Sequence, residues 1–513
     1  MRRCVTGLWV LVLVGSTMTG ACSSDSGGGT AGGGGGGGVS GAGGSKDAGK
    51  DSTSDAPSEA AAPSCTDKTK NGTESDVDCG GSCPNSCGDG QQCGSKTDCT
   101  SGVCQAGSCQ ASCSDGVKNG SETDIDCGGG ACPKCGGGKV CGGNGDCTSG
   151  VCAGGVCATV LGFAAAQTFP APSNPNTIAL ADFNGDKNLD VVVTNDYSAN
   201  VTVLLGKGDG TLGAGMAIFA GSGSYRPGGV ASSDLNGDGK ADLAVSEQYN
   251  NGGSGLCPGG SLFSLLGNGD GTFAAPAGIA AGTCPAGDSI ADLDGDKKLD
   301  VVIAECGNAA AGVFFGKGDG TFKAEVLYGA GGCPNTAAVG DVSGDGKVDL
   351  VTGNWNSNTI GVLLGAGNGT FGAAKTFAAG GFVRSGLLGD YNGDEILDVS
   401  VSGTSSARAL LGKGDGTFPT VAIYATASGA MWHAQGDFDG DGALDLAVPN
   451  YGANNVSVLL GVGDGTFKAA SDFTVGNGPA AAAVGDFNND GKLDIAIANG
   501  AAGSVSILLN SSK

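Results

Sequence analysis

The sequence is poor in the residues on which many enzymes depend. It has one histidine, His433, and only 3 tryptophans and 7 tyrosines among 513 residues. A single histidine excludes an HExxH zinc motif and any metal centre built from several histidines, and it leaves little material for a histidine-dependent triad. The scarcity of aromatic residues, together with 104 glycines, argues against a helical enzyme core and favours many turns and short strands.

Basic residues and long apolar runs are also scarce. The chain has 26 basic against 51 acidic residues, a formal charge of −25, which argues against an electrostatically driven nucleic-acid role. The apolar run from Leu8 to Val14 follows Met1-Arg2-Arg3 and is too short to cross a bilayer, as is every later run. We therefore predict a secretory signal peptide over residues 1–22.

The end of this segment, Gly20-Ala21-Cys22, resembles the lipobox of bacterial lipoproteins, although Thr19 replaces the usual leucine. The resemblance implies that Cys22 is lipidated and that the protein is exported to the outer membrane or cell surface, whereas simple cleavage would give a secreted protein. Residues 23–64 are rich in Gly, Ser and Ala without apolar periodicity, which predicts a disordered, flexible tether.

Sixteen cysteines between Cys65 and Cys157 form two copies of an eight-cysteine unit, residues 65–112 and 113–159. Because large apolar residues are almost absent from the first copy, we expect two small disulfide-rich modules, with 105 pairings open in each. Zinc is the alternative, suggested by Cys132-Pro133-Lys134-Cys135. The units resemble small, partly Dickkopf-like cysteine-rich repeats that accompany some bacterial surface proteins.

The most distinctive feature is an acidic stretch that occurs seven times, for example GDFDGDGALDLAVPN at 436–450. Oxygen side chains stand at the first, third, fifth and ninth positions of a tight loop, a spacing that predicts Ca²⁺ binding more than Mg²⁺. Solvated turns are the alternative, but turns do not require the acidic residue that every copy has at position nine. The candidate ligands of up to seven Ca²⁺ ions are Asp182, Asn184, Asp186, Asp190, Asp234, Asn236, Asp238, Asp242, Asp292, Asp294, Asp296, Asp300, Asp341, Ser343, Asp345, Asp349, Asp390, Asn392, Asp394, Asp398, Asp437, Asp439, Asp441, Asp445, Asp486, Asn488, Asp490 and Asp494.

The acidic stretches recur every 47 to 58 residues between 160 and 513, a period typical of propellers and other arrays. Each unit reads as four short strands, with a GDGTF-like hairpin turn after the third. The last unit lacks its fourth strand, while a spare strand candidate, 161–169, precedes the first. We therefore predict an all-β, seven-bladed β-propeller closed by its two ends.

These loops resemble FG-GAP or VCBS repeats, the family that builds the integrin α-subunit propeller and many bacterial surface proteins. The resemblance implies calcium loops on one face and ligand binding on the other, sometimes of sugars.

The predicted ligand face is formed by the second-to-third and fourth-to-first strand connections. Aromatic and charged residues gather there and could bind sugars or peptides, or simply fill the channel mouth: Tyr197, Tyr225, Arg226, Tyr249, Trp355, Phe382, Arg384, Trp432, His433 and Tyr451. Cys257, Cys284, Cys306 and Cys333 fall on the same face, where Cys257–Cys284 and Cys306–Cys333 would repeat a 27-residue separation, with Cys284–Cys306 as the alternative.

We therefore expect a calcium-binding surface or secreted propeller that binds carbohydrate or another protein, with no nucleic acid as partner and contact with the membrane only through its lipid. The alternatives are a polysaccharide lyase, using Tyr225, Arg226 or Arg384 with His433, and a passive scaffold.

Overall fold

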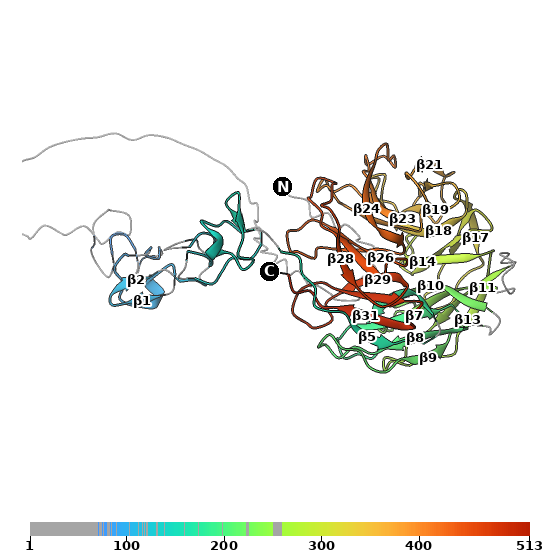
Figure 1. Ribbon diagram of the computed structural model, residues 1–513, viewed down its shortest axis with the longest axis horizontal. Coiled ribbons are helices and arrows are strands. Elements are labelled where there is room, and N and C mark those ends of the chain that lie inside the picture. The colour runs from blue at the N-terminus through green and yellow to red at the C-terminus, as the bar shows by residue number, and fades with distance from the viewer. Residues whose placement is uncertain are drawn as a thin grey trace, which may run out of the picture. The chain divides into compact units, whose positions relative to one another are not determined.

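The protein was analysed as a computed structural model, which describes residues 70, 74, 76–79, 83, 85–88, 90–101, 103–110, 112–114, 116, 118, 122–129, 132–137, 139–157, 160–172, 174–196, 198–221, 225–249 and 259–512. The predicted signal peptide, the tether, Cys22 and Cys65 lie outside these residues. Among the described residues no helix is long and apolar enough to cross a membrane. Figure 1 shows the described chain as strands and turns.

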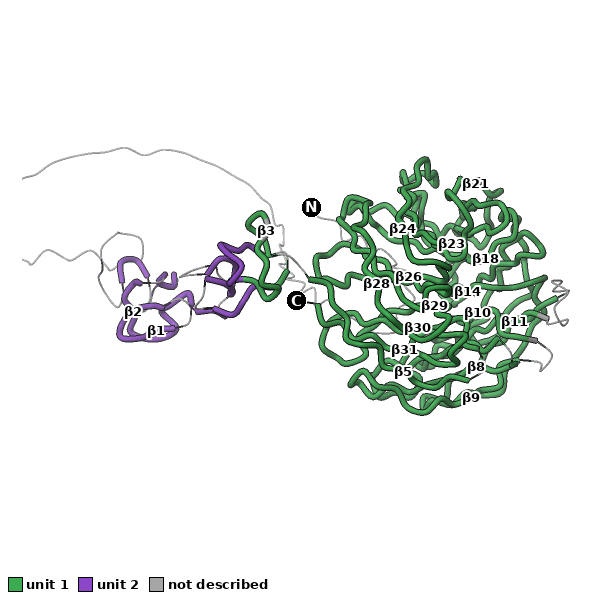
Figure 2. Tube along the Cα trace, in the orientation of Figure 1, with its two compact units in different colours: residues 1–16, 136–139, 147–513 green, residues 17–135, 140–146 purple. Residues whose placement is uncertain are grey.

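Contacts divide the described chain into two compact units (Figure 2). The described residues up to 135, with 140–146, form one unit, and residues 136–139 with those from 147 onward form the other. The domain boundaries set out above stay predictions.

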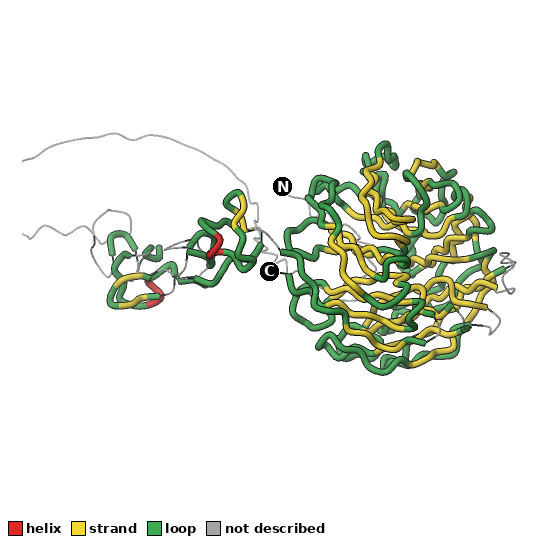
Figure 3. Tube along the Cα trace, in the orientation of Figure 1, coloured by secondary structure: helices red, strands yellow, loops and turns green. Residues whose placement is uncertain are grey.

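The cysteine-rich region has little regular structure beyond two 3₁₀ turns and two short hairpins (Figure 3). These are η1 (Lys96–Asp98), η2 (Asn144–Asp146), β1 (Cys104–Gln105) with β2 (Ser108–Cys109), and β3 (Cys152–Ala153) with β4 (Val156–Cys157). Disulfides stand in for a hydrophobic core, and they include Cys79–Cys87, Cys93–Cys104, Cys99–Cys109, Cys113–Cys132, Cys127–Cys135 and Cys147–Cys157. Both cysteines of the CxxC pair are thus oxidised, which removes the thiolates that the zinc alternative requires.

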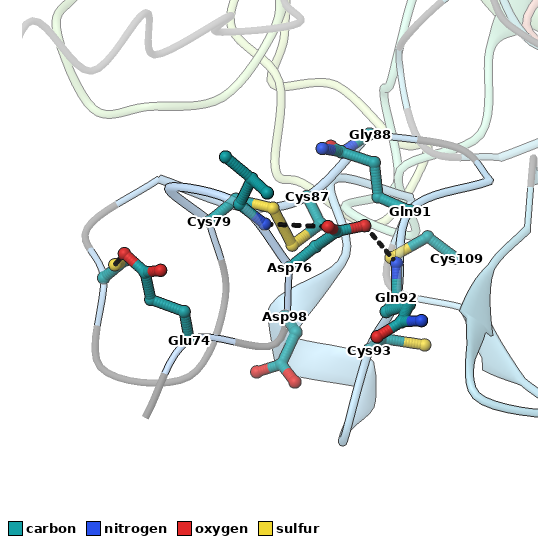
Figure 4. The surroundings of a disulfide bond; sticks show 12 residues. Glu74, Asp76, Cys79, Cys87, Gly88, Gln91, Gln92, Cys93, Asp98 and Cys109 are labelled. Atoms are coloured by element: carbon teal, nitrogen blue, oxygen red, sulfur yellow. Dashed lines mark hydrogen bonds between the residues drawn. A yellow bond between two sulfur atoms is a disulfide. The ribbon is translucent and has the colours of Figure 1, made fainter. Parts of the chain in front are cut away.

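In each cysteine-rich module an aspartate side chain joins two loops through hydrogen bonds to the backbone. Figure 4 shows Asp76 beside the Cys79–Cys87 disulfide, where its carboxylate accepts the backbone N–H of Gln92 at 2.7 Å. Asp124 accepts the N–H of Val140 at the same distance in the second module. The backbone donors of Gln92 and Val77 hold the pKa of Asp76 below its usual value.

The larger unit is a β-propeller of antiparallel sheets, as the repeats predict. Five sheets have four strands each and one has seven: β6 (Pro175–Ala181), β7 (Asp190–Asn195), β8 (Asn200–Leu204) and β9 (Met216–Phe219); β10 (Tyr225–Ser233), β11 (Asp242–Tyr249), β12 (Gly260–Leu265) and β13 (Ala277–Ala281); β14 (Pro285–Ala291), β15 (Asp300–Glu305), β16 (Ala310–Phe314) and β17 (Val326–Gly329); β18 (Pro334–Gly340), β19 (Asp349–Asn354), β20 (Thr359–Leu363) and β21 (Lys375–Ala378); β22 (Ser385–Gly389), β23 (Asp398–Leu410), β24 (Val421–Ala430), β25 (Ala434–Gly436), β26 (Asp445–Asn450), β27 (Asn455–Leu459) and β28 (Ser471–Thr474); and β29 (Pro479–Gly485), β30 (Asp494–Asn499), β31 (Ser504–Leu508) and β5 (Gln167–Pro170).

The seven-stranded sheet carries two of the seven repeats. Its thirteen-residue strand β23 runs through the second and third strand positions of the fifth repeat, and β24 meets β26 of the sixth repeat at the single pair Ala430–Asn450. Because two repeats share this sheet, the count of seven blades stays a prediction.

The two ends of the propeller chain meet in one sheet. β5, from the start of the unit, pairs with β31, from its end, as the incomplete last repeat predicts (Figure 1). The first strands of successive repeats also contact one another. β6 contacts β10, β10 contacts β14, β14 contacts β18, and β18 contacts β22. β25 contacts β29, and β29 contacts β6. Gln435, on β25, donates from Nε2 to the Leu388 carbonyl on β22 at 2.7 Å and completes this circuit.

The hydrophobic core lies between neighbouring sheets. The aromatic residues of the GDGTF-like turns pack edge-on against the preceding repeat, for example Phe273 on Phe183 at 5.5 Å and Phe371 on Tyr328 at 5.1 Å between ring centroids. Val191 and Val193 of the first repeat share a cluster with Ala496 of the seventh. Each sheet is therefore stabilised by the next along the chain.

A buried carboxyl pair occupies the interior of the third repeat. Glu305 is fully buried at the end of β15 and accepts the N–H of Gly282 at 2.7 Å, while the Oε1 of Glu325 is buried nearby. Burial and the neighbouring Glu325 carboxyl raise the pKa of Glu305. Protonation of Glu305 removes the repulsion between the two groups.

We predict that Glu305→Gln flattens part of the pH dependence of stability. Because the folded pKa is raised, the folded protein holds a proton that the unfolded chain releases, so this group's contribution falls as pH rises from the ordinary glutamate pKa towards the raised value. In urea unfolding between pH 5 and 9, the free energy of unfolding of Glu305→Gln should rise relative to that of the wild type as the pH rises. Glu395→Gln, at an exposed site, should show no such change. Parallel pH curves for wild type and Glu305→Gln would contradict the assignment.

Candidate calcium loops and the opposing cavity

Each acidic loop is shaped by its own side chains. In the sixth loop the first carboxylate, Asp437, accepts the backbone N–H groups of Gly440 at 2.7 Å, Asp441 at 3.1 Å and Gly442 at 2.9 Å. Asp441 at position five in turn accepts the N–H of Ala443 at 2.9 Å. The short acidic side chains thus satisfy the backbone of a turn that has no strand partner.

Positions four and six of all seven loops have positive φ. Position six is Gly239, Gly346, Gly442 and Gly491 in four loops, but Lys187, Lys297 and Glu395 adopt φ of 69°, 67° and 65° in the others. The non-glycine residues therefore keep the loop geometry at a cost of about 1 kcal/mol each.

The ninth position has a structural role that sequence reasoning missed. Asp445 is fully buried, and its two oxygens accept the N–H of Phe438 and the N–H of Gly461, each at 2.7 Å. The six counterparts do the same at 2.7–3.0 Å: Asp190, Asp242, Asp300, Asp349, Asp398 and Asp494. This carboxylate joins the acidic loop to the end of the third strand, so an acid there does not by itself indicate a metal.

Burial shifts these ninth carboxylates towards the neutral form. The pKa rises to about 7 at Asp445 and to about 6 at Asp300, chiefly through desolvation and further through the other acids of each loop. A bound cation would counter both effects by favouring the charged form.

Turns of one repeat also hold the loop of the repeat before it. Gly465, in the sixth GDGTF-like turn, donates to the Tyr391 carbonyl of the fifth loop at 2.9 Å. Gly210 of the first repeat makes the same bond to Phe487 of the seventh, at 2.9 Å. The loops are thus linked around the propeller.

Two loops bring their carboxylates together tightly enough to suit a metal ion. Oxygens of Asp292, Asp294 and Asp300 in the third loop lie within 4.8 Å of one another, as do those of Asp437, Asp439 and Asp445 in the sixth. These are the two loops with Asp at position three. The side chain of Asp439 is 1% exposed, and burial together with Asp441 raises its pKa. Clustered hard oxygens of this kind fit Ca²⁺.

The remaining loops satisfy their acids in other ways. Asn184, Asn392 and Asn488 at position three each donate from Nδ2 to the carboxylate at position five, at 3.0, 3.0 and 3.1 Å. Lysines pair with position five in the second, third and fourth loops, for example Lys298 with Asp296 at 2.9 Å and Lys347 with Asp345 at 3.0 Å, so this pairing is not confined to the loops without clustered carboxylates. Such exposed pairs contribute little and would yield to a divalent ion.

A cavity of about 330 Å³ lies at the other end of the first strands. Each first strand runs from this cavity to its acidic loop. All seven repeats contribute to the lining, which consists of Asn174, Pro175, Asn176, Asp196, Arg226, Gly228, Gln248, Ala286, Asn335, Arg384, Met431, Trp432, Tyr451, Ala480 and Gly500. Arg226 pairs with Asp196 at 3.7 Å and donates to Gln248 at 3.2 Å. The asparagines and Gln248 were missed by sequence reasoning because only their places at strand ends, rather than a motif, mark them.

A second cavity, of about 470 Å³, adjoins the first. Arg384, Met431 and Tyr451 line both, and the second adds Trp355, Phe382, Val383, Gly403, Thr404, Gly429 and Ala430. Tyr451 and Phe382 are 46% and 51% exposed. Six of the ten residues singled out from the sequence for this face therefore line a cavity: Arg226, Trp355, Phe382, Arg384, Trp432 and Tyr451.

His433 requires a correction, because it lies in the interior instead of on this face. It is 4% exposed, with Nε2 2.7 Å from the Ser400 hydroxyl and Nδ1 3.1 Å from that of Ser402. Burial lowers its pKa to about 3, so the ring is neutral. Tyr197 and Cys257 lie outside the described residues, as do the side chains of Tyr225 and Tyr249.

A disulfide braces the loops of the third and fourth repeats. It joins Cys306 to Cys333, which leaves no place for the alternative Cys284–Cys306 bond. Cys284 is disulfide-bonded as well.

Comparison with known proteins identifies the repeat. The sequence model of the FG-GAP-like repeat matches residues 182–245, 292–352, 341–401, 390–448 and 437–497, more than half of the chain. No curated protein sequence matches.

Several solved structures resemble the chain weakly. An Agrocybe aegerita lectin that recognises non-reducing terminal N-acetylglucosamine is 20% identical over 64% of this chain and 86% of its own, with a TM-score of 0.44. A streptogramin B lyase is 13% identical over 67% and 97%, with a TM-score of 0.46. The V. cholerae biofilm matrix protein Bap1 is 20% identical over 52% and 43%, with a TM-score of 0.34.

At these scores the likenesses carry no argument about function. The repeated loops and four-stranded sheets, together with the matches over more than half of its length, show that the chain belongs to the FG-GAP-like repeat family.

Proposed function

We propose that the chain is an exported, calcium-binding β-propeller that binds a carbohydrate or a surface protein. One observation carries the proposal: all seven repeats contribute to an aromatic and polar cavity at the end of the first strands opposite the acidic loops. Concave sites with aromatic walls and a few convergent polar groups are typical ligand sites.

The acidic loops would support this site from the far end of the same strands. Ca²⁺, when bound, supplies positive charge between carboxylates that otherwise repel one another. The residues that fit it best are the clustered aspartates of the third and sixth loops. Their ninth members, Asp300 and Asp445, are also bonded to the backbone, so cation binding would couple to the order of the sheet.

Export is supported by the disulfides of the cysteine-rich modules, since such bonds persist in oxidising compartments. Anchoring through a lipid on Cys22, with residues 23–64 as a tether, remains part of the proposal. Mass spectrometry of the membrane-associated protein would test it.

The lyase alternative loses His433 as its base. Proton abstraction requires a group that reaches the substrate, whereas His433 is buried, neutral and bonded to two serines. We therefore favour binding over catalysis.

A glycan array and a panel of surface proteins test the proposal. We expect saturable retention of at least one ligand, weakened about fivefold or more by Tyr451→Ala, since an exposed aromatic contact contributes about 1 kcal/mol. Phe219→Ala, an equally exposed aromatic on β9 that lines neither cavity, is the control. The proposal fails if nothing is retained, and new unsaturated sugar ends without saturable retention would favour the lyase.

A further inference from the structure

The second cavity holds one charged residue. Three of its lining residues are aromatic, Trp355, Phe382 and Tyr451, and the others apart from Arg384 are uncharged. Arg384 is therefore the one lining residue that carries a charge at neutral pH. The side chain also reaches the first cavity, where the only acid, Asp196, is already paired with Arg226 at 3.7 Å.

The guanidinium of Arg384 is fixed in place. Its Cζ lies 3.7 Å from the centroid of the Trp355 ring and 5.5 Å from that of Trp432. Its backbone N–H donates to the Ser402 carbonyl at 2.8 Å, and its own carbonyl accepts from Asn335 at 2.6 Å. Stacking on aromatic faces leaves the edge of the planar guanidinium, with its donors, open.

That edge has no acceptor among the described residues. The other arginines of this region differ: Arg226 donates to Gln248, and Arg408 donates to the carbonyls of Phe382 and Gly403 at 2.9 and 3.4 Å. Burial lowers the pKa of Arg384 to about 10, which reflects the loss of water around a group that is still charged at neutral pH. A desolvated cation whose N–H donors have no hydrogen-bond acceptor is costly, and an anion that brings acceptors relieves that cost.

We propose that Arg384 binds an acidic sugar residue by donating hydrogen bonds to its carboxylate or sulfate. The sugar ring lies against the exposed aromatic side chains of the second cavity. The inference rests on the proposed binding function and names the class of ligand. Arginine presents two parallel N–H groups that match a planar carboxylate or two sulfate oxygens. The aromatic walls suit the apolar faces of a pyranose ring and add area without adding charge.

The test uses the purified full chain with immobilised polygalacturonate, dextran sulfate and neutral dextran. We expect the wild type to retain one or both acidic polymers and not dextran, and Arg384→Gln to weaken that retention about 10- to 100-fold, as loss of a charge-assisted pair implies. Lys413→Gln removes one exposed positive charge at the other end of the propeller and should leave retention unchanged.

The outcomes separate this inference from the proposed function. Retention of polygalacturonate alone identifies a carboxylate ligand, and retention of dextran sulfate identifies a sulfate ligand. Retention of neutral glycans alone, or of acidic glycans equally by Arg384→Gln, would overturn the acidic-sugar inference and leave the binding function standing, whereas no retention of any glycan or surface protein would overturn both. Should Arg384→Gln not fold, the salt dependence of wild-type retention decides, since affinity that does not fall with NaCl would refute an ionic anchor.

Discussion

Replacing Asp445 by alanine should lower the free energy of unfolding by about 3 kcal/mol, even in EDTA. The substitution leaves the buried N–H groups of Phe438 and Gly461 without acceptors, and each such group costs about 1–3 kcal/mol, partly offset by removal of a desolvated carboxylate. Urea unfolding of the two proteins in EDTA measures the difference.

The matched control is Asp441→Asn in the same loop. Asp441 lies on the exposed rim and accepts only the nearby N–H of Ala443, so we expect a loss below about 1 kcal/mol in EDTA. If Asp445→Ala destabilised the protein only when calcium is present, the ninth carboxylate would act as a metal ligand alone and the backbone role would be wrong.

Asp439→Asn should have opposite effects with and without calcium. Without the ion, the substitution removes a 1% exposed carboxylate whose pKa is raised by burial and by the nearby Asp441, although Lys468 lies 4.0 Å away, so stability should rise slightly. With calcium, the variant loses a charged ligand and with it much of the stabilisation that the sixth site supplies, about 2.7 kcal/mol for an ion at one hundred times its dissociation constant.

Thermal melts in 2 mM CaCl₂ and in EDTA measure both effects. The wild type should melt at a clearly lower temperature in EDTA, and Asp439→Asn should show a smaller difference between the two conditions. Asp464→Asn, in the exposed turn that follows β27, controls for the loss of an aspartate outside the acidic loops. Identical shifts for wild type and Asp439→Asn would exclude the sixth loop as a calcium site.

The fold was predictable because its signals are local and repeated. The repeat of 47 to 58 residues, the Asp-Gly turns and the missing last strand were enough to predict four-stranded sheets and the pairing of β5 with β31. The merging of two repeats was not predictable, because it depends on one pair, Ala430–Asn450, and on a strand β23 that continues through Ser402-Gly403-Thr404, where the sequence favours a turn.

The candidate sites were predictable only in part. Sequence spacing placed the acids, but it could not show that both oxygens of a residue such as Asp445 are taken by the backbone. It grouped His433 with Trp432 because both fall in the same strand connection, whereas only Trp432 reaches the cavity and His433 is buried against Ser400 and Ser402. Asn176 and Gln248 carry no motif, and their place in the cavity follows from how the strands converge.

Calorimetric titration of Ca²⁺ into the metal-free full chain tests the central claim most directly. We predict saturable binding of at least two ions per chain, with loss of sites in the Asp294→Asn/Asp439→Asn double variant and weaker binding of Mg²⁺. An absence of saturable binding at millimolar Ca²⁺, or an unchanged isotherm in the double variant, would contradict the proposal that these loops are calcium sites.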